Sequence, residues 1–367
     1  MLGSPRLLIV ADDLTGALDS ACEAARRGIG TRVFLSPQAL AAAEGDALPP
    51  VVAVSTGSRD GSEHASRQAM TQVCACLSWL APAHVMKKVD SRLKGHVALE
   101  TTLLAQVLNK QEIVAAPALP DMGRTQQAGM LSGTGIDAPI NVATKFEGLE
   151  VEVPDIVSPD DMKAAASKEN ELAVGARSLA EALVTRLWPE AVLSERPLLQ
   201  APAIFAIGSR DPITLAQVAQ LGLAAIPAPD GQLEEQGNVQ EGLFQLFQMV
   251  PGPGAPADPR SAGDAFAGAL ADRFLRQQLP ATLIACGGET AGSILSRMGV
   301  GHLDVEGTAL PGVPVSRAQL ADGRTVAVVT KSGGFGGREA LAQLAKMVDN
   351  RFVAGQFGRI DNRGISA

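Results

Sequence analysis

The sequence contains no tyrosine, only two tryptophans and 3% aromatic residues in total. Proteins that bind single-stranded nucleic acid stack its bases on aromatic side chains, which are scarce here. Positive charge is also in deficit, because 31 Lys and Arg residues face 39 Asp and Glu residues, for a formal net charge of −8. Such a chain is a poor partner for a phosphate backbone. The composition argues against a nucleic-acid partner and favours a small-molecule ligand.

Long apolar runs and cysteines are scarce as well. No segment approaches the ~20 apolar residues that cross a bilayer, and the apolar stretch Leu7–Ala11 is short and ends in two aspartates, unlike a signal peptide. Four cysteines do not make a disulfide framework in a chain of 367 residues. Cys74 and Cys76 are two residues apart on an expected helix, so they cannot chelate zinc together. We expect no membrane partner, no metal site built by the protein, and a cytoplasmic location.

Two common nucleotide-binding motifs are missing. The chain has no G-x-x-x-x-G-K-[ST] loop, and no G-x-G-x-x-G follows the first expected strand. The missing motifs therefore argue against a dehydrogenase that binds a dinucleotide on one of its sheets.

Short apolar runs alternate with longer segments of helical spacing, which is typical of βαβ units. This pattern predicts an α/β fold with two doubly wound domains, mostly parallel sheets, and a cleft between the domains that could hold a ligand. The chain is also longer than one hydrophobic core usually supports. We place the domains at residues 1–198 and 199–367, because the alternation restarts at Ala203–Ile207 after the Pro-containing segment Leu193–Pro202.

The pattern predicts most elements of the first domain. Residues 120–139 are rich in Gly and Thr and are expected to form a long loop near the site rather than regular structure. The segment Glu150–Val157 is a further candidate strand. The other expected strands are Leu7–Ala11, Thr31–Leu35, Val51–Ser55, Val85–Val89, Glu112–Ala116 and Leu172–Val174, and the expected helices are Ala17–Arg27, Glu63–Leu80, Val97–Leu108, Asp160–Ala166 and Ser178–Leu187.

Charged residues follow the expected strands of the first domain. In an open α/β sheet, ligands bind outside the carboxyl ends of the strands. Asp12 and Asp13 follow the first strand, and because side chains alternate along a strand, only one of them can face a ligand. The alternative is that an acid at this position only caps the next helix. Either aspartate could accept the proton of an attacking hydroxyl. A second polar cluster lies at the end of the expected strand Val85–Val89, and its cations could bind a carboxylate or a phosphoryl group. Arg59 and Arg124 would add positive charge to this anion-binding site. The residues of the cluster are Lys87, Lys88, Asp90, Ser91, Arg92 and Lys94.

In the second domain two glycine-rich turns follow expected strands and could hold phosphate on their backbone N–H groups. One follows Ala281–Ala285 and precedes a helix expected at Ser293–Met298, and the other follows Thr325–Val329. Each turn alone is more often a plain strand-to-helix connection, but the pair could open onto one ligand. The residues that we expect to contact the nucleotide are Gly287, Gly288, Thr290, Lys331, Gly333, Gly334, Phe335 and Gly336. Acids in one domain and phosphate loops in the other suggest phosphoryl transfer.

A competing motif is the segment Ser261–Gly268 (SAGDAFAG), which looks like the anion hole and base of ribokinase-type sugar kinases. Asp264 would then be the base for a neutral sugar. However, Ser261 replaces the first Gly of that motif, and no apolar strand precedes it. We favour an ordinary helix start with Asp264 in the first turn.

Five motifs in this order resemble the four-carbon acid sugar kinase family (DUF1537). They are Ala11–Ala17 (ADDLTGA), Lys87–Ser91 (KKVDS), Gly123–Thr125 (GRT), Gly287–Ala291 (GGETA) and Lys331–Gly336 (KSGGFG). The resemblance runs from about Leu7 to Met347.

The resemblance implies a kinase with an N-terminal sugar-acid domain and a C-terminal nucleotide domain. ATP and Mg²⁺ would be the cofactors, and the substrate would be threonate, erythronate, 3-oxo-tetronate or a branched acid such as 3-oxo-isoapionate. Asp12, Asp13, Arg59, Lys88, Asp90 and Ser91 would face the sugar acid, and Ser209, Gly288 and Gly333–Gly336 would hold ATP.

We identify Asp12, Asp13, Lys88 and Asp90 as the catalytic candidates, and either Asp12 or Asp13 as the base. A non-catalytic sugar-acid-binding regulator is the alternative from another class. The sequence leaves the phosphorylated hydroxyl and the oligomeric state open, with a homodimer as one candidate.

Overall fold

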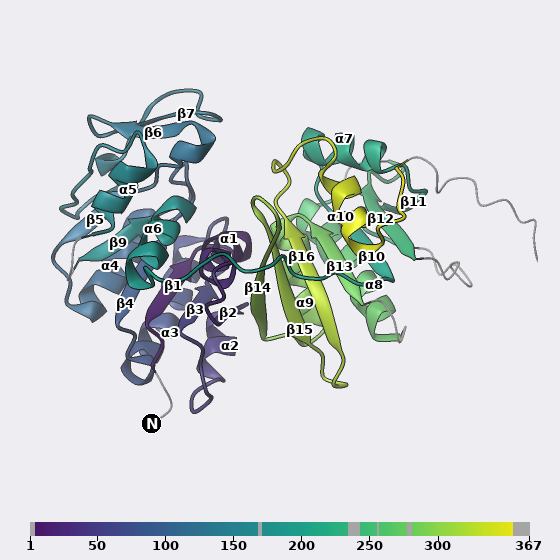
Figure 1. Cartoon of the computed structure of the whole chain (residues 1–367), viewed down its shortest axis with the longest axis horizontal. Helices are drawn as coiled ribbons and strands as arrows, with labels where there is room; N and C mark the ends of the chain where they lie inside the picture. Colours follow the sequence, from purple (N-terminus) through teal and green to yellow (C-terminus); the bar gives the residue numbers. More distant parts are fainter. Residues whose placement is uncertain (1–3, 168–170, 234–242, 255–256, 277–280, 355–367) are drawn as a thin grey trace, which may run out of the picture. The chain divides into compact units, whose positions relative to one another are not determined.

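The computed structural model describes residues 4–167, 171–233, 243–254, 257–276 and 281–354. The chain forms two compact units (Figure 1). The first contains the chain up to Glu195 together with Gly301–Gly307, and the second contains Arg196–Val300 and the chain from Thr308 onward. The return of Gly301–Gly307 to the first unit was not predicted from the sequence.

The main sheet of the first unit is parallel through six strands. Its strand order is β2-β3-β1-β4-β9-β5, and β14 (His302–Leu310) adds an antiparallel edge, since its residues His302–Asp304 pair with β2. The strands are β1 (Leu7–Ala11), β2 (Thr31–Phe34), β3 (Val51–Ser55), β4 (His84–Lys88), β5 (Ile113–Ala116) and β9 (Leu172–Gly175). Strands β1, β3, β5 and β9 are buried along their whole length, which explains their continuous apolar runs.

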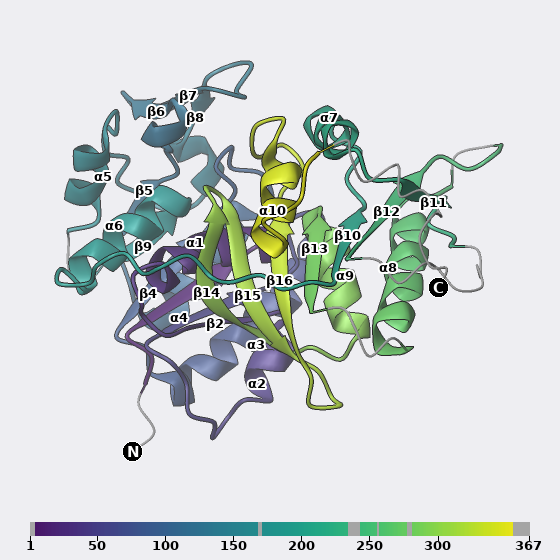
Figure 2. The same ribbon diagram turned by 45° about the vertical axis from the view of Figure 1, so that its right-hand side comes forward.

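Helices pack in two groups on this sheet (Figure 2). Contacts join α1 to α6 and α6 to α5, and a separate series joins α2 to α3 and α3 to α4. The strand order requires this division, because right-handed crossovers in opposite directions place their helices on opposite faces. The helices are α1 (Leu14–Ala25), α2 (Pro37–Ala41), α3 (Glu63–Leu80), α4 (Val97–Leu108), α5 (Pro159–Ala165) and α6 (Arg177–Leu187).

The expected long loop at residues 120–139 is wrong, because much of it is regular structure. A short 3-10 helix, η1 (Pro120–Met122), leads into a three-stranded antiparallel sheet of β6 (Arg124–Gln127), β7 (Met130–Gly133) and β8 (Ile140–Asn141). A two-residue turn, Ala128-Gly129, joins β6 to β7 with positive φ at both residues. Hairpins of this type usually carry Asn-Gly or Asp-Gly, so the turn lacked its usual signature.

The candidate strand at Glu150–Val157 is also wrong. This segment makes only isolated bridges, from Glu152 to Val114 of β5 and from Ile156 to Gln126 of the small sheet. Pro154 lies between them and has no N–H to donate to a ladder. Gln126 instead donates to the carbonyl oxygens of Ala115 and Pro154, at 3.0 and 2.6 Å, and so ties the small sheet to β5.

The second unit contains a sheet in the order β11-β12-β10-β13-β16-β15-β14. The five strands β11, β12, β10, β13 and β16 run parallel, and β15 is antiparallel to β16. Helix α7 packs against α10, and α8 packs against α9. The elements are β10 (Ala203–Ile207), α7 (Pro212–Leu221), β11 (Ala225–Pro229), β12 (Phe244–Val250), α8 (Pro259–Arg276), β13 (Thr282–Cys286), α9 (Gly288–Arg297), β15 (Val313–Gln319), β16 (Thr325–Lys331) and α10 (Ala340–Val348).

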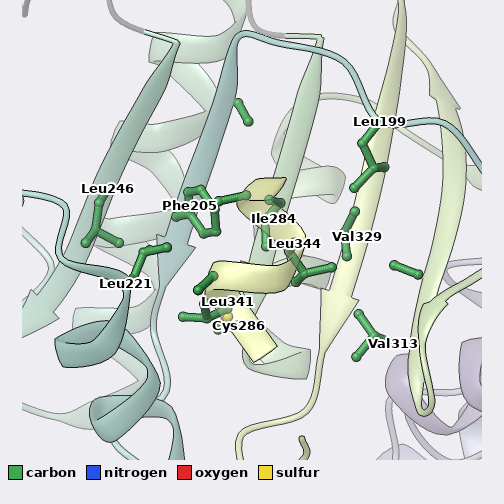
Figure 3. Packing of buried hydrophobic residues seen from close by; sticks show 14 of the residues in the cluster. Leu199, Phe205, Leu221, Leu246, Ile284, Cys286, Val313, Val329, Leu341 and Leu344 are labelled. Carbon is green, nitrogen blue, oxygen red and sulfur yellow. The ribbon is translucent and has the colours of Figure 1, made fainter. Parts of the chain in front are cut away.

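The core of the second unit lies between α10 and this sheet. Leu341 and Leu344 of α10 pack over Phe205, Ile284 and Val329 from three adjacent parallel strands (Figure 3). All five side chains are fully buried. This core holds the carboxyl ends of the three strands at fixed positions beneath the loops that follow them.

The predicted α/β class with mostly parallel sheets is confirmed. The expected helix at Ser293–Met298 starts five residues earlier, at Gly288, because the glycine-rich turn is itself the first turn of α9. Strands β11, β12, β14 and β15 were not predicted. No helix in the described ranges combines the length and the apolar character needed to span a bilayer.

Candidate active site

The carboxyl ends of the parallel strands in the first unit lie level with one another. Ala11 of β1 pairs with Ser55 of β3 and with Lys88 of β4, and Lys88 pairs in turn with Gly175 of β9. The residues that follow these strand ends therefore meet at one edge of the sheet. This register brings Asp12, Asp13, Arg59 and the segment after Lys88 together, as the sequence predicted.

Arg59 joins the two aspartates. Its Nε and Nη2 donate to the two carboxylate oxygens of Asp12 at 2.9 and 2.7 Å, and Nη2 also donates to Asp13 Oδ1 at 2.6 Å. The backbone N–H groups of Ser58 and Arg59 donate to the Asp12 carbonyl oxygen. Arg59 is therefore neutralised by two acids and is poorly placed to grip a further carboxylate.

The two aspartates differ in exposure and in bonding. Asp12 is buried, and burial alone would raise its pKa, but the hydrogen bonds and charge of Arg59 and the charges of Lys87 and Lys88 outweigh it and lower the pKa. Asp13 is more exposed and caps α1, accepting hydrogen bonds from the Gly16 N–H at 2.9 Å and from the Thr15 hydroxyl. The capping by Asp13 explains why α1 starts at Leu14 rather than at Ala17.

Lys88 is a buried cation without an acidic partner. Its ammonium donates to the Val89 carbonyl oxygen at 2.9 Å, and no carboxylate among the described residues lies within ion-pair distance. A Cβ atom added to Gly16 would lie 2.9 Å from Lys88 Nζ and 2.5 Å from Asp13 Oδ1. Glycine at this position therefore lets the start of α1 approach the lysine closely.

Lys87 does not join this cluster, which corrects the prediction that it grips a substrate. Neighbouring residues of a strand point to opposite faces. Lys87 is fully buried beneath the site, where its ammonium lies 2.7 Å from Glu100 of α4. Glu100 also accepts hydrogen bonds from Ser58 and Ser66, so this ion pair anchors the loop that carries Arg59.

Breaking this pair should destabilise the fold. We expect Glu100→Gln to lower the free energy of unfolding by about 3–5 kcal/mol at neutral pH, because Lys87 then keeps an uncompensated buried charge. Burial raises the pKa of Glu100, but Lys87, Ser58 and Ser66 outweigh it and lower the pKa below the ordinary 4.5. The contribution of Glu100 to the free energy of unfolding is thus fully present above the unfolded-state pKa and is lost as the pH falls through the lower folded-state pKa.

Urea unfolding at neutral and acidic pH measures both effects. The gap between wild type and Glu100→Gln should shrink in acid. Glu63→Gln is the control, since it breaks the exposed pair of Glu63 with Arg67 and should change stability by less than about 1 kcal/mol. An equally small effect of Glu100→Gln would contradict the anchoring role.

Asp90, Ser91 and Arg124 form the other side of the site. Arg124 of β6 donates from Nη1 to the Ser91 hydroxyl at 2.5 Å, and from Nε and Nη2 to the Thr134 carbonyl oxygen at 3.1 and 2.6 Å. Asp90 accepts from the Arg92 N–H at 2.9 Å and helps to raise the pKa of Arg59, so it lies within electrostatic range of that residue. Arg124 is buried and, within the described residues, has no acidic partner. Arg92 and Lys94 are exposed.

Sequence reasoning missed Arg177, the first residue of α6. It follows the carboxyl end of β9, next to β4, and its guanidinium bonds to Asp121 and lies near Asp19 and Glu23. Asp121 also accepts from the Ser178 hydroxyl at 3.2 Å. The arginine therefore fixes the start of the small sheet. Its position directly after a parallel strand was the signal that could have found it.

In the second unit, three loops start level at the carboxyl ends of β10, β13 and β16. Ile207 pairs with Cys286, and Cys286 pairs with Lys331. The N–H groups of Gly208 and Ser209 donate to the Cys286 carbonyl oxygen, and the Gly287 N–H donates to that of Lys331 at 2.9 Å. The two predicted glycine-rich turns thus lie side by side, with the Gly208-Ser209 turn beside them.

The loops interlock through small side chains. A Cβ atom on Gly208 would collide with the Thr290 hydroxyl, and one on Gly333 would lie 2.5 Å from Ser209 Oγ. Gly287 precedes α9 with φ +112° and offers no side chain to cap it. Within the described part of the chain no side chain at the N-cap bonds to the first N–H groups of α9, and uncapped N–H groups at a helix N-terminus can bind anions.

Lys331 holds the third loop from inside. It is fully buried, and its ammonium donates to the carbonyl oxygens of Ser332, Gly333 and Phe335 and to the Thr214 hydroxyl. Burial lowers its pKa, against the opposing influence of Cys286 and Asp211. The Phe335 ring packs near Gly312 at the turn between β14 and β15. Lys331 and Phe335 therefore shape the loop, while Gly334 is exposed.

Asp264 is not at a helix N-terminus. Helix α8 starts at Pro259, so Asp264 lies in its second turn rather than the first, and its side chain is exposed. Asp258 accepts hydrogen bonds from the N–H and the hydroxyl of Ser261 at the helix start. Residues 255–256 of the preceding Pro/Gly-rich stretch lie outside the described residues. The ribokinase-type motif Ser261–Gly268 therefore lies within α8 rather than at a turn that precedes a helix.

The chain matches two family models. Residues 7–139 match the family model for a sugar-binding N-terminal domain, and residues 254–341 match that for a nucleotide-binding C-terminal domain. The chain is 25% identical to a 3-oxo-tetronate kinase of Pseudomonas fluorescens over 94% of this chain and 99% of the relative. It is 28% identical to a D-threonate kinase of Cupriavidus necator, over 91% and 96% respectively.

The fold also matches a crystal structure of a Haemophilus influenzae protein of family DUF1537. That match has a TM-score of 0.70 and 19% sequence identity, and it covers 93% of this chain and 99% of the other.

Proposed function

Because this chain belongs to the four-carbon acid sugar kinase family, we propose that it transfers the γ-phosphoryl group of ATP to a hydroxyl of a small sugar acid. The observation that carries the proposal is that Lys88 and Arg124 are buried cations with no carboxylate at ion-pair distance among the described residues, and that Asp12 and Asp13 lie near Lys88. Unpaired buried cations suit an anionic substrate, and a carboxylate near a hydroxyl suits proton removal. Full-length relatives that are named as kinases of four-carbon acids support this reading.

In the first unit the substrate carboxylate would bind Lys88 and Arg124. This revises the expectation that Arg59 grips it, because Asp12 and Asp13 already neutralise Arg59. Asp12 would position Arg59, and Asp13, the more exposed acid, would accept the proton of the attacking hydroxyl. The hydroxyl oxygen then bonds to the γ-phosphorus while the bond to ADP breaks, in an in-line displacement. Asp90 and Ser91 would complete the substrate contacts.

In the second unit ATP would bind where the three loops meet. The N–H groups of Gly288 and Thr290 at the start of α9, and those of Gly333 and Gly334, would face its phosphates. Ser209 lies between these two sets. The glycines fit such a ligand because side chains there would fill the approach to the backbone.

Mg²⁺ would be held mainly by phosphate oxygens, where it neutralises their charge. Within the described residues no group of three or more His, Cys, Asp or Glu side chains could hold a metal ion. Asp211 brings a carboxylate to the loop, with Oδ2 3.6 Å from a Cβ added to Gly334. It fits the single protein ligand that a magnesium–nucleotide complex commonly uses.

ADP release with Mg-ATP tests the proposal. The panel would contain threonate, erythronate, 3-oxo-tetronate, branched acids such as 3-oxo-isoapionate, and neutral sugars of similar size. We expect turnover with at least one acid and none with the neutral sugars, because these lack the group that Lys88 and Arg124 would bind. Turnover restricted to neutral sugars would contradict the proposal and revive the role of Asp264. Binding of an acid without turnover would favour a regulator.

A further inference from the structure

Helix α1 brings a third acidic side chain to the site of the first unit. Asp19 lies three residues after Gly16, and side chains three apart share one face of a helix. Gly16 is the point where α1 approaches Lys88 Nζ. Asp19 therefore lies one helical turn beyond that point, on the same face, and its Oδ2 is 3.8 Å from Nε of Arg177, the first residue of α6.

The carboxylate of Asp19 receives no hydrogen bond from any described residue. Its Oδ1 is enclosed and has no donor, and its Oδ2 is 3.8 Å from Arg177 Nε, beyond hydrogen-bond distance. About a quarter of the side chain is exposed. Burial raises the pKa of Asp19, and Arg177 and Lys88 only partly oppose this. A carboxylate in such a place is costly unless something donates to it.

Each neighbouring acid already receives at least one hydrogen bond. Asp12 and Asp13 accept from Arg59, and Asp13 also accepts from Gly16 and Thr15. Glu23, the next acid along α1, lies 2.6 Å from Arg26 and also accepts from Arg177. Arg177 is turned toward Asp121, to which it bonds directly. Among these acids, Asp19 is thus the one whose carboxylate receives no hydrogen bond from the described residues.

We propose that Asp19 is a specificity-determining residue that accepts a hydrogen bond from a hydroxyl group of the substrate whose carboxylate binds Lys88. This inference rests on the proposed function. Like charge keeps the substrate carboxylate away from Asp19, so the donor must be a neutral group, and the donors of a sugar acid are its hydroxyls. The carboxylate and the hydroxyl of one small molecule would then bind to Lys88 and Asp19, a cation and an anion on adjacent elements.

The consequence is selection for polyhydroxy acids over their deoxy analogues. A hydrogen bond from a neutral donor to a charged acceptor changes affinity by about 10–100-fold. A site built to bind a hydroxyl also disfavours the analogue that leaves its acceptor unpaired. Wild-type protein should therefore bind a trihydroxybutyrate about 10–100-fold more tightly than one of the dihydroxybutyrates that lack a single hydroxyl.

Calorimetric titration without ATP measures this ratio of Kd values independently of turnover. For Asp19→Ala we expect the ratio to fall close to one, through weaker binding of the trihydroxy acid alone. Asp19→Asn keeps the shape but loses the charge, so its ratio should be intermediate. Glu23→Gln is the matched control, because it removes an acid of the same helix that also contacts Arg177, and it should keep the wild-type ratio.

A wild-type ratio in Asp19→Ala would overturn the inference, whatever its thermal stability. A loss of selectivity in Glu23→Gln equal to that in Asp19→Ala would also overturn it, because the effect would then come from releasing Arg177. Failure of wild type to bind any of the acids would overturn the inference together with the substrate assignment. Selective binding that depends on Asp19 without ADP formation would uphold it and reject the kinase alone.

Discussion

Replacing Asp13 by asparagine should lower kcat by about 10²–10⁴-fold and leave the fold intact. Asparagine caps a helix about as well as aspartate, so the start of α1 should persist. It cannot accept a proton at neutral pH. The loss should appear in kcat, with a smaller change in the KM for the sugar acid. Steady-state kinetics together with thermal unfolding of the same preparation would measure both parts of this expectation.

Asp60→Asn is the matched control, since Asp60 is exposed and adjacent to Arg59. It should keep near-wild-type kinetics. Asp12→Asn should also abolish most turnover, but through a different route, because Asp12 occupies two donors of Arg59 and fixes its position. Near-normal kcat in both Asp13→Asn and Asp12→Asn would reject this acid pair as catalytic machinery.

Replacing Lys331 by methionine should raise the KM for ATP by about 10²-fold or more. Methionine has a similar length but cannot donate to the three carbonyl oxygens and the hydroxyl that Lys331 binds. Each buried acceptor left unpaired costs about 1–3 kcal/mol, so the loop should leave the conformation seen here. Lys346→Met, at an exposed site on α10, provides the control.

Measuring how tightly Lys331→Met binds the sugar acid distinguishes a local effect on the ATP site from unfolding of the whole protein. Lys331 lies in the second unit, whereas the proposed acid site lies in the first. Calorimetry should therefore give an unchanged Kd for the acid in Lys331→Met. A wild-type KM for ATP in this variant would show that the loop does not depend on the buried ammonium.

The sequence predicted the arrangement of the strand ends well, for a clear physical reason. Buried parallel strands are continuous apolar runs, and their carboxyl ends share one edge of a sheet. Charged residues directly after Leu7–Ala11 and Val51–Ser55 therefore had to meet, and Asp12, Asp13 and Arg59 do so. The glycine-rich turns after β13 and β16 meet by the same logic.

The sequence could not show which charges neutralise one another. Lys87 and Lys88 look equivalent, but strand alternation sends Lys87 to Glu100, 13 positions along the chain and on another element. Arg59 seemed free to bind substrate, yet two acids occupy it. Asp19 and Arg177 become part of the site only through the packing of α1 against α6.

The elements that were missed are those formed by tertiary pairing. The small sheet of β6, β7 and β8 has neither an apolar alternation nor a usual turn sequence, and Gln126 holds it to β5 through side-chain hydrogen bonds. Strand β14 divides between the two units, a split that no local pattern encodes.

Identification of the phosphorylated product tests the central claim most directly. Protein, Mg-ATP and the preferred acid would be incubated, and the phosphorus would be followed by ³¹P NMR. The proposal predicts that the γ-phosphoryl group appears as a phosphomonoester of the sugar acid, in amounts equal to the ADP formed, and that Asp13→Asn forms almost none. Appearance of the phosphorus only as inorganic phosphate, or no consumption of ATP with any acid, would contradict it.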